Sequence, residues 1–238
     1  MINKRWTSLL KLVILEPRLA WLAWQLKYSK RTFLSWSKIL SITQSFHLLR
    51  KRWPKKPLQV SEFGVGRGGS ATLLGWLVGR YGGNLALYDV FGQIPPPTQK
   101  DGERARQRYE KIRHREGQDY YGNIPDLVEV IRREISQICP PDRIEIIQGR
   151  YEDILPYQTS TKAFDLVHID CDWYESSRVV LAYLKDHLNP SAVLQIDDYG
   201  HWQGSRKAFE EAGWLDGYQA TPVDGALVVD TAFNKPSI

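Results

Sequence analysis

Two apolar stretches of the sequence end in aspartates. Residues 164–169 are followed by Asp170 and Asp172, and residues 192–196 are followed by Asp197 and Asp198. If both stretches are neighbouring strands of a parallel sheet, their carboxyl ends meet at the edge where such sheets bind ligands. Carboxylates that share a pocket raise one another's pKa unless a cation compensates, and oxygen ligands alone favour Mg²⁺ or Mn²⁺. We therefore predict that Asp170, Asp197 and Asp198 bind a divalent cation. The alternative is that acids such as Asp172 or Asp198 only cap the helices that follow.

A glycine-rich segment follows an earlier apolar stretch. Glycines at such a turn let the backbone pass close to a ligand, and the start of the next helix favours negative charge. The pattern of an acid followed by alternate glycines is typical of S-adenosylmethionine enzymes, and it is formed by Glu62, Gly64, Gly66 and Gly68. The dinucleotide fingerprint is matched as well, by Gly64, Gly66 and Gly69.

Two acids near this loop bear on the choice of cofactor. Asp89, at the end of the second apolar stretch, is placed to bind ribose hydroxyls in either interpretation. Glu62 favours S-adenosylmethionine, because an acid just before the glycines can pair with the amino group of methionine but would repel a pyrophosphate.

The elements that must position these residues alternate between strand and helix. This alternation predicts an α/β fold, a Rossmann-like parallel sheet built from βαβ units with an antiparallel C-terminal hairpin. The expected strands are 58–63, 85–90, 143–148, 164–169 and 192–196, and the expected hairpin is 217–222 with 226–230. The expected helices are 70–80, 102–115, 124–138, 175–187 and 205–212.

The first 56 residues form a basic, tryptophan-rich helical prefix, and residues 57–238 are expected to form the catalytic domain. The net charge of the chain is +5, yet residues 1–56 carry 13 Lys or Arg against one acid, Glu16. Pro17 should interrupt the first helix, and Thr32 or Ser35 should start another. Three roles suit the prefix: a cap over the active site, a contact between subunits of a homo-oligomer, or an interfacial helix on anionic lipid. Nucleic-acid binding is not expected, because the basic region contains no recognised module.

Cysteine content and hydropathy favour a cytoplasmic protein, with membrane contact only at the periphery through the prefix. The two cysteines, Cys139 and Cys171, are too few and too distant for a disulfide framework. The longest apolar stretch, residues 9–26, contains charged residues and Pro17, so it falls short of the ~20 apolar residues of a spanning helix.

With these residues in hand, the sequence resembles the macrocin O-methyltransferase family, whose members methylate sugar hydroxyls of macrolides and related natural products. The resemblance covers residues from about 60 to 209. Its blocks are EFGVGRGGS at 62–70, YDVFGQIP at 88–95, GRYEDILP at 149–156, HIDCDWYES at 168–176 and QIDDYGHW at 195–202.

The resemblance implies a class I methyltransferase fold, S-adenosylmethionine as cofactor and Mg²⁺ at the three aspartates. It also implies that Glu62 and the glycines hold the methionine part, that Asp89 holds the ribose, and that Tyr151 and Glu152 lie on the adenine side. The prefix and the long segment after Asp89 depart from the family's antibiotic enzymes, so the resemblance extends to fold and cofactor better than to substrate.

The predicted chemistry narrows the acceptor. The methyl group of a sulfonium is already activated, so the protein must align a hydroxyl with it and lower the pKa of that hydroxyl. Two vicinal hydroxyls can chelate Mg²⁺, so we expect a diol on a sugar of a natural product or glycan. We expect Asp170 to be a ligand and the proton acceptor, and Asp197 and Asp198 to be ligands. His168 is interpreted as a packed core histidine.

Aromatic residues near the predicted site could stack on a sugar ring, although ordinary packing is the favoured interpretation for at least half of them. These candidates are Tyr120, Tyr121, Trp173, Tyr174 and Trp202, and His201 is a further candidate on a loop. Two other functions remain open from the residues alone: a nicotinamide-dependent oxidoreductase and a noncatalytic binding protein that keeps the fold.

Overall fold

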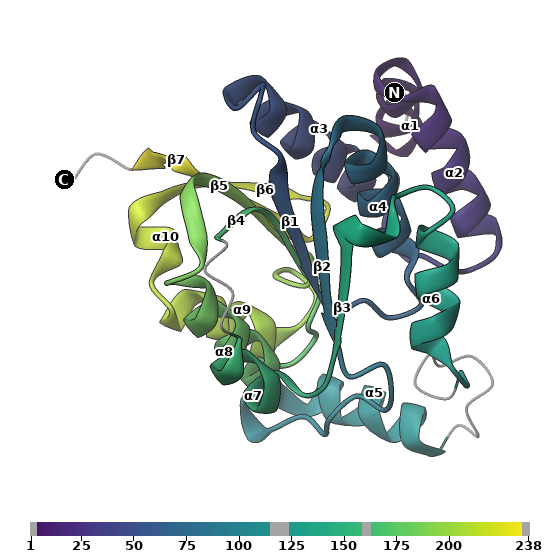
Figure 1. Cartoon of the computed structure of the whole chain (residues 1–238). Helices are drawn as coiled ribbons and strands as arrows, with labels where there is room; N and C mark the ends of the chain where they lie inside the picture. Colours follow the sequence, from purple (N-terminus) through teal and green to yellow (C-terminus); the bar gives the residue numbers. More distant parts are fainter. Residues whose placement is uncertain (1–3, 115–123, 159–162, 235–238) are drawn as a thin grey trace.

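The computed structural model describes residues 4–114, 124–158 and 163–234 of the chain. Seven strands form one sheet in the order β3-β2-β1-β4-β5-β7-β6, and the first five are parallel (Figure 1). β7 pairs antiparallel with β5 and β6. The strands are β1 (Leu58–Phe63), β2 (Gly83–Asp89), β3 (Ile144–Gln148), β4 (Phe164–Ile169), β5 (Leu188–Ile196), β6 (Tyr218–Val223) and β7 (Ala226–Asn234). The Rossmann-like class with its C-terminal hairpin is confirmed.

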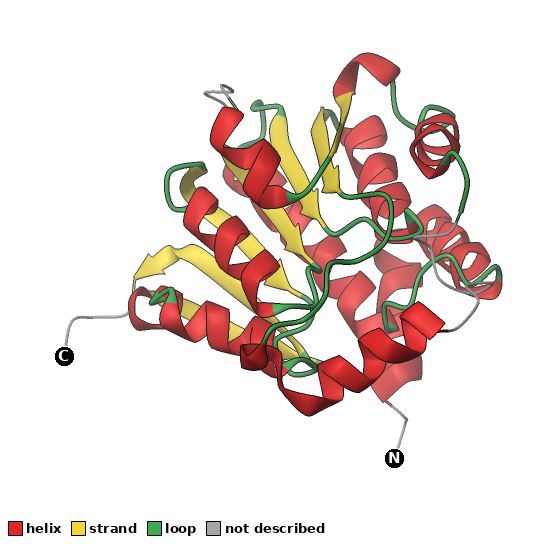
Figure 2. Ribbon diagram, turned by 90° about the horizontal axis from the view of Figure 1, so that it is seen from below, coloured by secondary structure: helices red, strands yellow, loops and turns green. Residues whose placement is uncertain are grey.

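Helices cover both faces of this sheet, as the view in Figure 2 shows. The prefix contains α1 (Lys4–Leu15), α2 (Pro17–Tyr28) and α3 (Trp36–Arg52). The other longer helices are α4 (Gly69–Tyr81), α5 (Gly102–His114), α6 (Leu127–Ile135), α8 (Tyr174–Leu184) and α9 (Gln203–Glu211). The short ones are α7 (Tyr151–Ile154), α10 (Trp214–Gly217) and the 3-10 turns η1 (Gln99–Asp101), η3 (Pro141–Arg143) and η4 (Leu155–Tyr157).

Alternation of side chains along the strands produces two hydrophobic cores. Leu85 and Leu87 of β2 belong to the core that also contains apolar residues of α1, α2, α3, α4 and α6. Ala86 and Tyr88 of the same strand belong to the opposite core, which contains residues of α8, α9 and α10. Because successive side chains of a strand point to opposite faces, Glu62 of β1 and His168 of β4 lie on the first face, together with Val60 and Leu166.

The prefix helices pack as part of the first core. Pro17 occupies the first turn of α2, and the Ser35 side chain accepts a hydrogen bond from Lys38 N to cap α3. Leu12, Leu19 and Phe46 are fully buried in the same cluster as Leu58 of β1. The expected boundary near residue 56 lies between α3 and β1. The segments on its two sides share one hydrophobic cluster. In the described part of the chain, no helix combines the length and apolar character needed to cross a bilayer.

Candidate active site

The predicted cofactor and cation residues lie in a row along the carboxyl edge of the sheet. In the strand order, Tyr151 follows β3, Asp89 ends β2, Gly64 follows β1, Asp170 follows β4 and Asp197 follows β5. The strand order reverses between β1 and β4, and ligands of open α/β sheets bind at such a reversal. The sheet therefore brings the glycine loop and the aspartates together although they are about a hundred residues apart in sequence.

Glycine is required in this loop mainly for close approach of the chain. Gly64 has φ +93°, and a Cβ atom there would lie 1.9 Å from the carbonyl oxygen of Asp170. A Cβ atom at Gly69 would lie 2.5 Å from the carbonyl oxygen of Arg31, in the α2–α3 connection. Gly64 thus sets the spacing between the loop and the aspartates, and Gly69 lets the prefix close over the loop.

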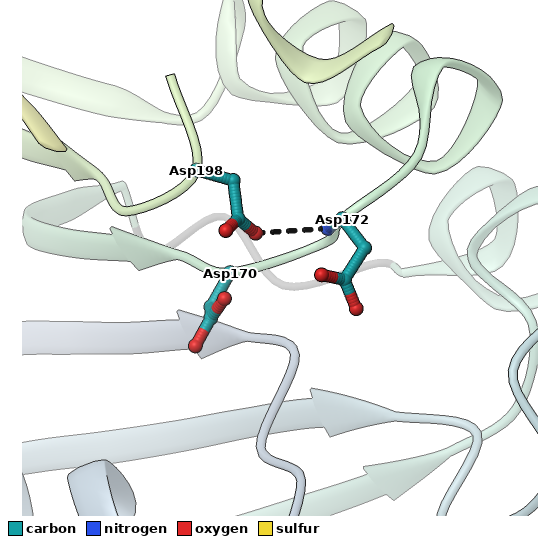
Figure 3. A group of neighbouring side chains, drawn as sticks. All are labelled: Asp170, Asp172 and Asp198. Carbon is teal, nitrogen blue, oxygen red and sulfur yellow. Dashed lines mark hydrogen bonds between the residues drawn. The ribbon is translucent and has the colours of Figure 1, made fainter. Parts of the chain in front are cut away.

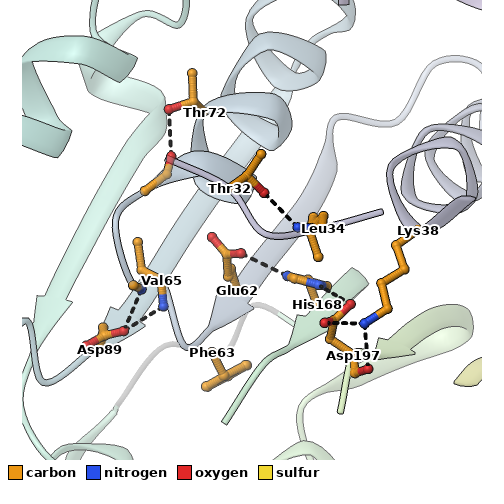
Figure 4. Close-up of polar contacts among 12 residues, drawn as sticks. Thr32, Leu34, Lys38, Glu62, Phe63, Val65, Thr72, Asp89, His168 and Asp197 are labelled. Carbon is orange, nitrogen blue, oxygen red and sulfur yellow. Dashed lines mark hydrogen bonds and ion pairs between the residues drawn. The ribbon is translucent and has the colours of Figure 1, made fainter. Parts of the chain in front are cut away.

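Asp89 holds the glycine loop in this structure. Its Oδ2 accepts hydrogen bonds from the backbone of Val65 (2.6 Å) and Gly66 (3.0 Å) (Figure 4). Its Oδ1 accepts one from Phe91 N (2.7 Å). Burial raises the pKa of Asp89, and these backbone donors act in the opposite direction. A carboxylate oxygen has more than one lone pair, so a ribose contact would be additional to this role.

Three carboxylates face one another beyond the ends of β4 and β5. One oxygen from each of Asp170, Asp172 and Asp198 lies within 4.8 Å of the other two (Figure 3). Asp172 adopts the left-handed region with φ +57°, which asparagine and aspartate tolerate better than most residues. Its backbone N–H donates to Asp198 Oδ2 at 3.1 Å. This turn brings the carboxylate of Asp172 into the group, which the spacing of residues along the strands did not predict.

These carboxyl groups are held in an environment that penalises their charge. Burial first, and the neighbouring Asp172 and Asp197 second, raise the pKa of Asp198 to about 8. Burial and Asp170 raise the pKa of Asp172 to about 7. Burial and the charges of Asp198 and Asp197 raise the pKa of Asp170 well above its ordinary value. The nearby cations His168, Arg108 and Lys38 act in the opposite direction but do not offset the burial and the mutual repulsion.

Asp197, in contrast, is neutralised by the protein. Lys38 Nζ of α3 donates to Asp197 Oδ2 at 2.7 Å and to the Asp197 carbonyl oxygen at 3.1 Å, and both side chains are buried. His168 Nε2 lies 3.7 Å from Asp197 Oδ1. Burial works in the opposite direction, but His168 and Lys38 hold the pKa of Asp197 below its ordinary range. Asp172 thus forms a close group with Asp170 and Asp198, and Asp197 lines the same cavity, bonded to Lys38.

A buried polar chain continues from Asp197 to the glycine loop. Glu62 of β1 and His168 of β4 are register partners, and His168 Nδ1 lies 2.8 Å from Glu62 Oε1 (Figure 4). Burial opposes protonation, but the two flanking carboxylates raise the pKa of His168 to about 10. His168 is thus a buried cation between two acids, located in the core as its strand position suggested.

The Lys38–Asp197 pair should contribute strongly to stability. Removing one partner of a buried ion pair leaves an unpaired charge, so we expect Lys38→Met to lower the free energy of unfolding by about 3 kcal/mol. Urea denaturation would measure the loss. Lys207→Met is the matched control, because its pair with Glu211 is about half exposed (45% and 46%) and should contribute less than about 1 kcal/mol. Equal losses in the two variants would contradict a structural role for the buried pair.

A cavity of about 320 Å³ connects the glycine loop with the aspartates. Its wall includes Gly64–Gly66, Asp170, Asp172, Asp197 and Asp198. The α2–α3 connection and α3 contribute Arg31, Thr32, Phe33, Leu34 and Lys38, and α5 contributes Arg108 and Ile112. The prefix thus forms part of the wall of the cavity, and so does the long segment after Asp89.

The residues proposed to contact substrate divide into three groups. Trp173, His201 and Trp202 line the cavity, and the two indole rings meet edge to face at 5.1 Å. Tyr174 is not part of this lining, and its hydroxyl group is bonded to Lys100 and Glu211, each at 2.5 Å. Tyr120 and Tyr121 fall outside the described residues.

The residues expected on the adenine side lie beyond Asp89, away from this cavity. Tyr151 is buried, and its ring meets Phe63 edge to face at 6.0 Å. Glu152 is exposed and pairs with Arg150. Adenine contacts by Tyr151, through its ring, and by Glu152, through its carboxylate, both stay proposals.

Comparison with known proteins agrees with this geometry. A profile of the macrocin-O-methyltransferase (TylF) family matches residues 55–214. The chain belongs to this family. It is an O-methyltransferase by family, with the match covering the glycine loop, the aspartates and most of the cavity. No curated protein matches the sequence.

Several solved methyltransferase structures share the fold of this macrocin O-methyltransferase family member. The O-methyltransferase NovP has a TM-score of 0.71 at 18% identity, with 85% of this chain and 83% of NovP covered. The calicheamicin methyltransferase CalS11 has a TM-score of 0.63 at 18% identity, covering 81% and 77%. TomG from Streptomyces achromogenes has a TM-score of 0.56 at 16% identity, covering 97% and 99%. At these identities the likeness concerns the fold.

The acidic group fits a divalent cation. Its donors are all carboxylate oxygens, which Mg²⁺ and Mn²⁺ prefer. The three side chains are mutually close, their pKa values are raised by one another, and Asp197 Oδ1 accepts no hydrogen bond. A bound cation would add positive charge at the centre of this group.

Stability should therefore depend on pH and on Mg²⁺ together. The folded carboxyl groups of Asp172 and Asp198 hold protons up to about pH 7 and 8, whereas the unfolded chain loses them near its ordinary pKa of 3.8. The folded state binds more protons, so the free energy of unfolding of the cation-free protein falls as the pH rises through this window. Because Mg²⁺ replaces these protons, it should raise Tm more at about pH 8.5 than at about pH 6. Thermal melts at matched ionic strength would measure the two shifts. A shift that shrinks with rising pH would contradict binding at these carboxylates.

Sequence reasoning missed three parts of the site: Asp172 as a member of the acidic group, Lys38 as the partner of Asp197, and Phe33 at the cavity wall. The IDCD segment contained a signal for Asp172, because Asp170 and Asp172 follow the same strand. Nothing local identifies Lys38, one of 13 basic residues in the prefix. Its role depends on how α3 packs against the sheet.

Proposed function

We propose that this O-methyltransferase transfers a methyl group from S-adenosylmethionine to a hydroxyl of a vicinal diol, in the presence of Mg²⁺ or Mn²⁺. The acceptor would be a sugar of a natural product or glycan. One observation carries the proposal: the acidic group lines the same cavity as the glycine loop, at the strand reversal of the sheet.

Binding of S-adenosylmethionine is supported by the loop and by fold relatives. TomG is described in complex with S-adenosylmethionine, and PaMTH1 from Podospora anserina, with a TM-score of 0.55, is described as bound to S-adenosylhomocysteine. Glu62 is buried beside the loop, and its Oε2 accepts no hydrogen bond. We assign Glu62 and Gly64–Gly69 to the methionine part and Asp89 to the ribose.

Asp170, Asp172 and Asp198 would hold the cation. When bound, it supplies positive charge that lowers the pKa of a coordinated hydroxyl and fixes two neighbouring hydroxyls at once. Lys38 holds Asp197 Oδ2, whereas Asp197 Oδ1 accepts no hydrogen bond, so Asp197 could add one oxygen to the site without losing this ion pair. Removal of Lys38 takes a positive charge away from this carboxylate, so Lys38→Met should bind Mn²⁺ more tightly than the unmodified chain.

The residues of the chain then act on the acceptor. The acceptor oxygen attacks the methyl carbon, the carbon–sulfur bond breaks with its electrons moving to sulfur, and the hydroxyl proton leaves to a carboxylate. We assign the role of proton acceptor to Asp170, because this residue lies at the end of β4 beside the cavity. Asp172 is the second candidate, because it also lines the cavity and lies on a turn beyond the strand. Both residues are also proposed ligands, so single asparagine variants are compared at Mn²⁺ concentrations that saturate each variant: the one that lacks the base stays inactive, whereas one that lacks only a ligand recovers turnover.

A sugar acceptor suits the cavity wall. The edge-to-face pair of Trp173 and Trp202 presents apolar ring surface, and sugar rings pack against such surface. NovP is described as an O-methyltransferase, and CalS11 is described as a TDP-rhamnose 3'-O-methyltransferase of calicheamicin biosynthesis. Nucleotide-linked deoxysugars and glycosylated natural products are therefore the first acceptors to test.

The test measures S-adenosylhomocysteine release with this acceptor panel, before and after EDTA treatment. We expect turnover to disappear with EDTA and to return with Mg²⁺ or Mn²⁺. Turnover that persists without divalent cation would contradict the cation requirement. Calorimetry with S-adenosylhomocysteine and with NAD tests the cofactor independently, and we expect binding of the first only. Binding of NAD alone would favour the oxidoreductase, and cofactor binding without turnover on any acceptor would favour a noncatalytic role.

A further inference from the structure

The outer surface of the two N-terminal helices contains an unusual concentration of exposed apolar side chains. Among the described residues, nearly all large apolar side chains that are exposed belong to residues 1–56, and Tyr157 is the exception. On α1 and α2 they are Trp6, Leu10, Val13, Ile14, Leu15, Trp21, Trp24 and Tyr28. We call this set the α1–α2 surface. Monomeric proteins rarely expose apolar side chains in such density, and large patches of this kind mark interaction sites.

The exposed side chains are ordered along each helix. On α1, Trp6, Leu10 and Val13 follow the spacing of one helical face. On α2, the ring of Trp24 stacks on Trp21 with centroids 5.0 Å apart and on Tyr28 with centroids 5.5 Å apart. The two helices contact each other, and Figure 1 shows them at one edge of the molecule. They therefore present ridges of aromatic and aliphatic side chains to the outside.

The charges around these ridges have a single sign. The exposed basic residues are Arg5, Lys11, Arg18 and Lys30. Glu16 is the sole acid in residues 1–56, and it is 5% exposed, with its carboxylate bonded to His47 and Tyr81. The α1–α2 surface therefore combines apolar side chains with basic ones, and residues 1–56 expose no acid beside them.

We propose that the α1–α2 surface docks on an anionic lipid bilayer. Interfacial helices place Trp, Tyr and aliphatic side chains at the boundary of headgroups and acyl chains, and flanking Lys and Arg contact anionic headgroups. The α1–α2 surface offers both the apolar and the basic side chains. Residues 1–56 expose no acid that would repel an anionic bilayer, because Glu16 is buried. The proposal concerns the surface alone and does not depend on the chemistry of the cavity.

A second copy of the chain fits this surface less well. A two-fold symmetric contact would bring the same basic residues of both copies together, without an exposed acid on the surface to pair with them. A nucleic acid would satisfy the positive charge but would leave Leu10, Val13 and Ile14 without an apolar partner. A bilayer satisfies both the apolar and the charged component.

Docking would bring the cavity close to the lipid. Phe33 follows α2, is 80% exposed, and also lines the wall of the cavity beside Arg31 and Thr32. The α2–α3 connection therefore joins the α1–α2 surface to the site. An acceptor attached to the membrane would have a short path to the aspartates.

Vesicle cosedimentation of the full chain tests the proposal. We expect binding to vesicles of phosphatidylcholine with phosphatidylglycerol at low salt, weaker binding at high salt, and little binding to phosphatidylcholine alone. The double variant Trp21→Ser/Trp24→Ser tests the apolar component, and Lys11→Glu/Arg18→Glu tests the charged one. Each should weaken binding by roughly ten-fold or more. Tyr157→Ser is the control, because it removes from outside the surface an aromatic residue that is more exposed (79%) than Trp21 (60%) or Trp24 (46%).

Fold and function of the variants are checked in parallel. Because the replaced side chains are exposed, their thermal melts and their S-adenosylhomocysteine affinity should equal those of the unmodified chain. Failure to sediment with anionic vesicles at low salt would overturn the proposal, and so would equal binding to neutral vesicles. Light scattering measures the alternative: a dimer that Trp21→Ser/Trp24→Ser dissociates would assign the surface to a second copy instead.

Discussion

Asp198→Asn should reduce methyl transfer by at least about a hundred-fold, which corresponds to about 2.7 kcal/mol of barrier. Asparagine keeps the shape of the side chain and can still accept the hydrogen bond from Asp172 N. It removes one of the three charges that would hold the cation, and a neutral amide binds a hard cation less well than a carboxylate. Turnover at saturating cofactor measures the loss of the cation site, and calorimetry with S-adenosylhomocysteine measures cofactor binding. We expect turnover to be lost and the affinity for S-adenosylhomocysteine to be retained.

The same substitution should stabilise the cation-free protein. Asp198 is buried next to Asp170 and Asp172, and its pKa of about 8 reflects that cost. Removing one charge relieves the repulsion, so Tm without cation should rise at about pH 8.5, whereas the gain in Tm from Mg²⁺ should disappear. Asp186→Asn is the control, because Asp186 is exposed at the end of α8, outside the cavity. A variant with normal turnover, or one whose Tm still responds to Mg²⁺, would argue against the acidic group as the cation site.

Gly64→Ala should destabilise the protein by about 4 kcal/mol or more and disturb the site. Two costs combine, since the residue has φ +93° and its Cβ atom would lie 1.9 Å from the carbonyl oxygen of Asp170. A strained backbone conformation and overpacking each cost about 1–3 kcal/mol, often more when the obstacle is backbone. The strands β1 and β4 would have to separate at the edge where cofactor and cation are expected. Chemical denaturation and cofactor affinity should both report the change.

Two other glycines separate these costs. Gly82 has φ +84° with nothing within 4 Å of a Cβ atom, so Gly82→Ala should show the backbone cost alone. Gly217, in α10, has open space and no positive φ, so Gly217→Ala should be nearly neutral. We expect the order Gly64, Gly82, Gly217 in loss of stability. Similar losses at Gly64 and Gly82 would mean that the contact with Asp170 is easily relieved.

Much of the fold could be predicted because its signals are local. The strands β1, β3 and β4 begin and end within one residue of the predicted bounds, since alternating apolar runs and flanking turns specify them. β5 begins at Leu188, earlier than the expected 192, because Asn189, Pro190 and Ser191 do not resemble a strand. Pairing with β4 extends it there: Leu188 is the partner of Phe164, and the register shifts before Val193. A tertiary contact overrides local preference in this segment.

The sequence alone determined the class of the site. Aspartates after two strands and glycines after a third had to meet at one edge, because the carboxyl ends of parallel strands share it. The tertiary structure decided which carboxylates face one another. The left-handed turn at Asp172 brings its side chain to Asp170 and Asp198, and the packing of α3 places Lys38 in an ion pair with Asp197. Turn conformation and helix packing depend on contacts between residues far apart in the chain, and no local pattern of the sequence contains them.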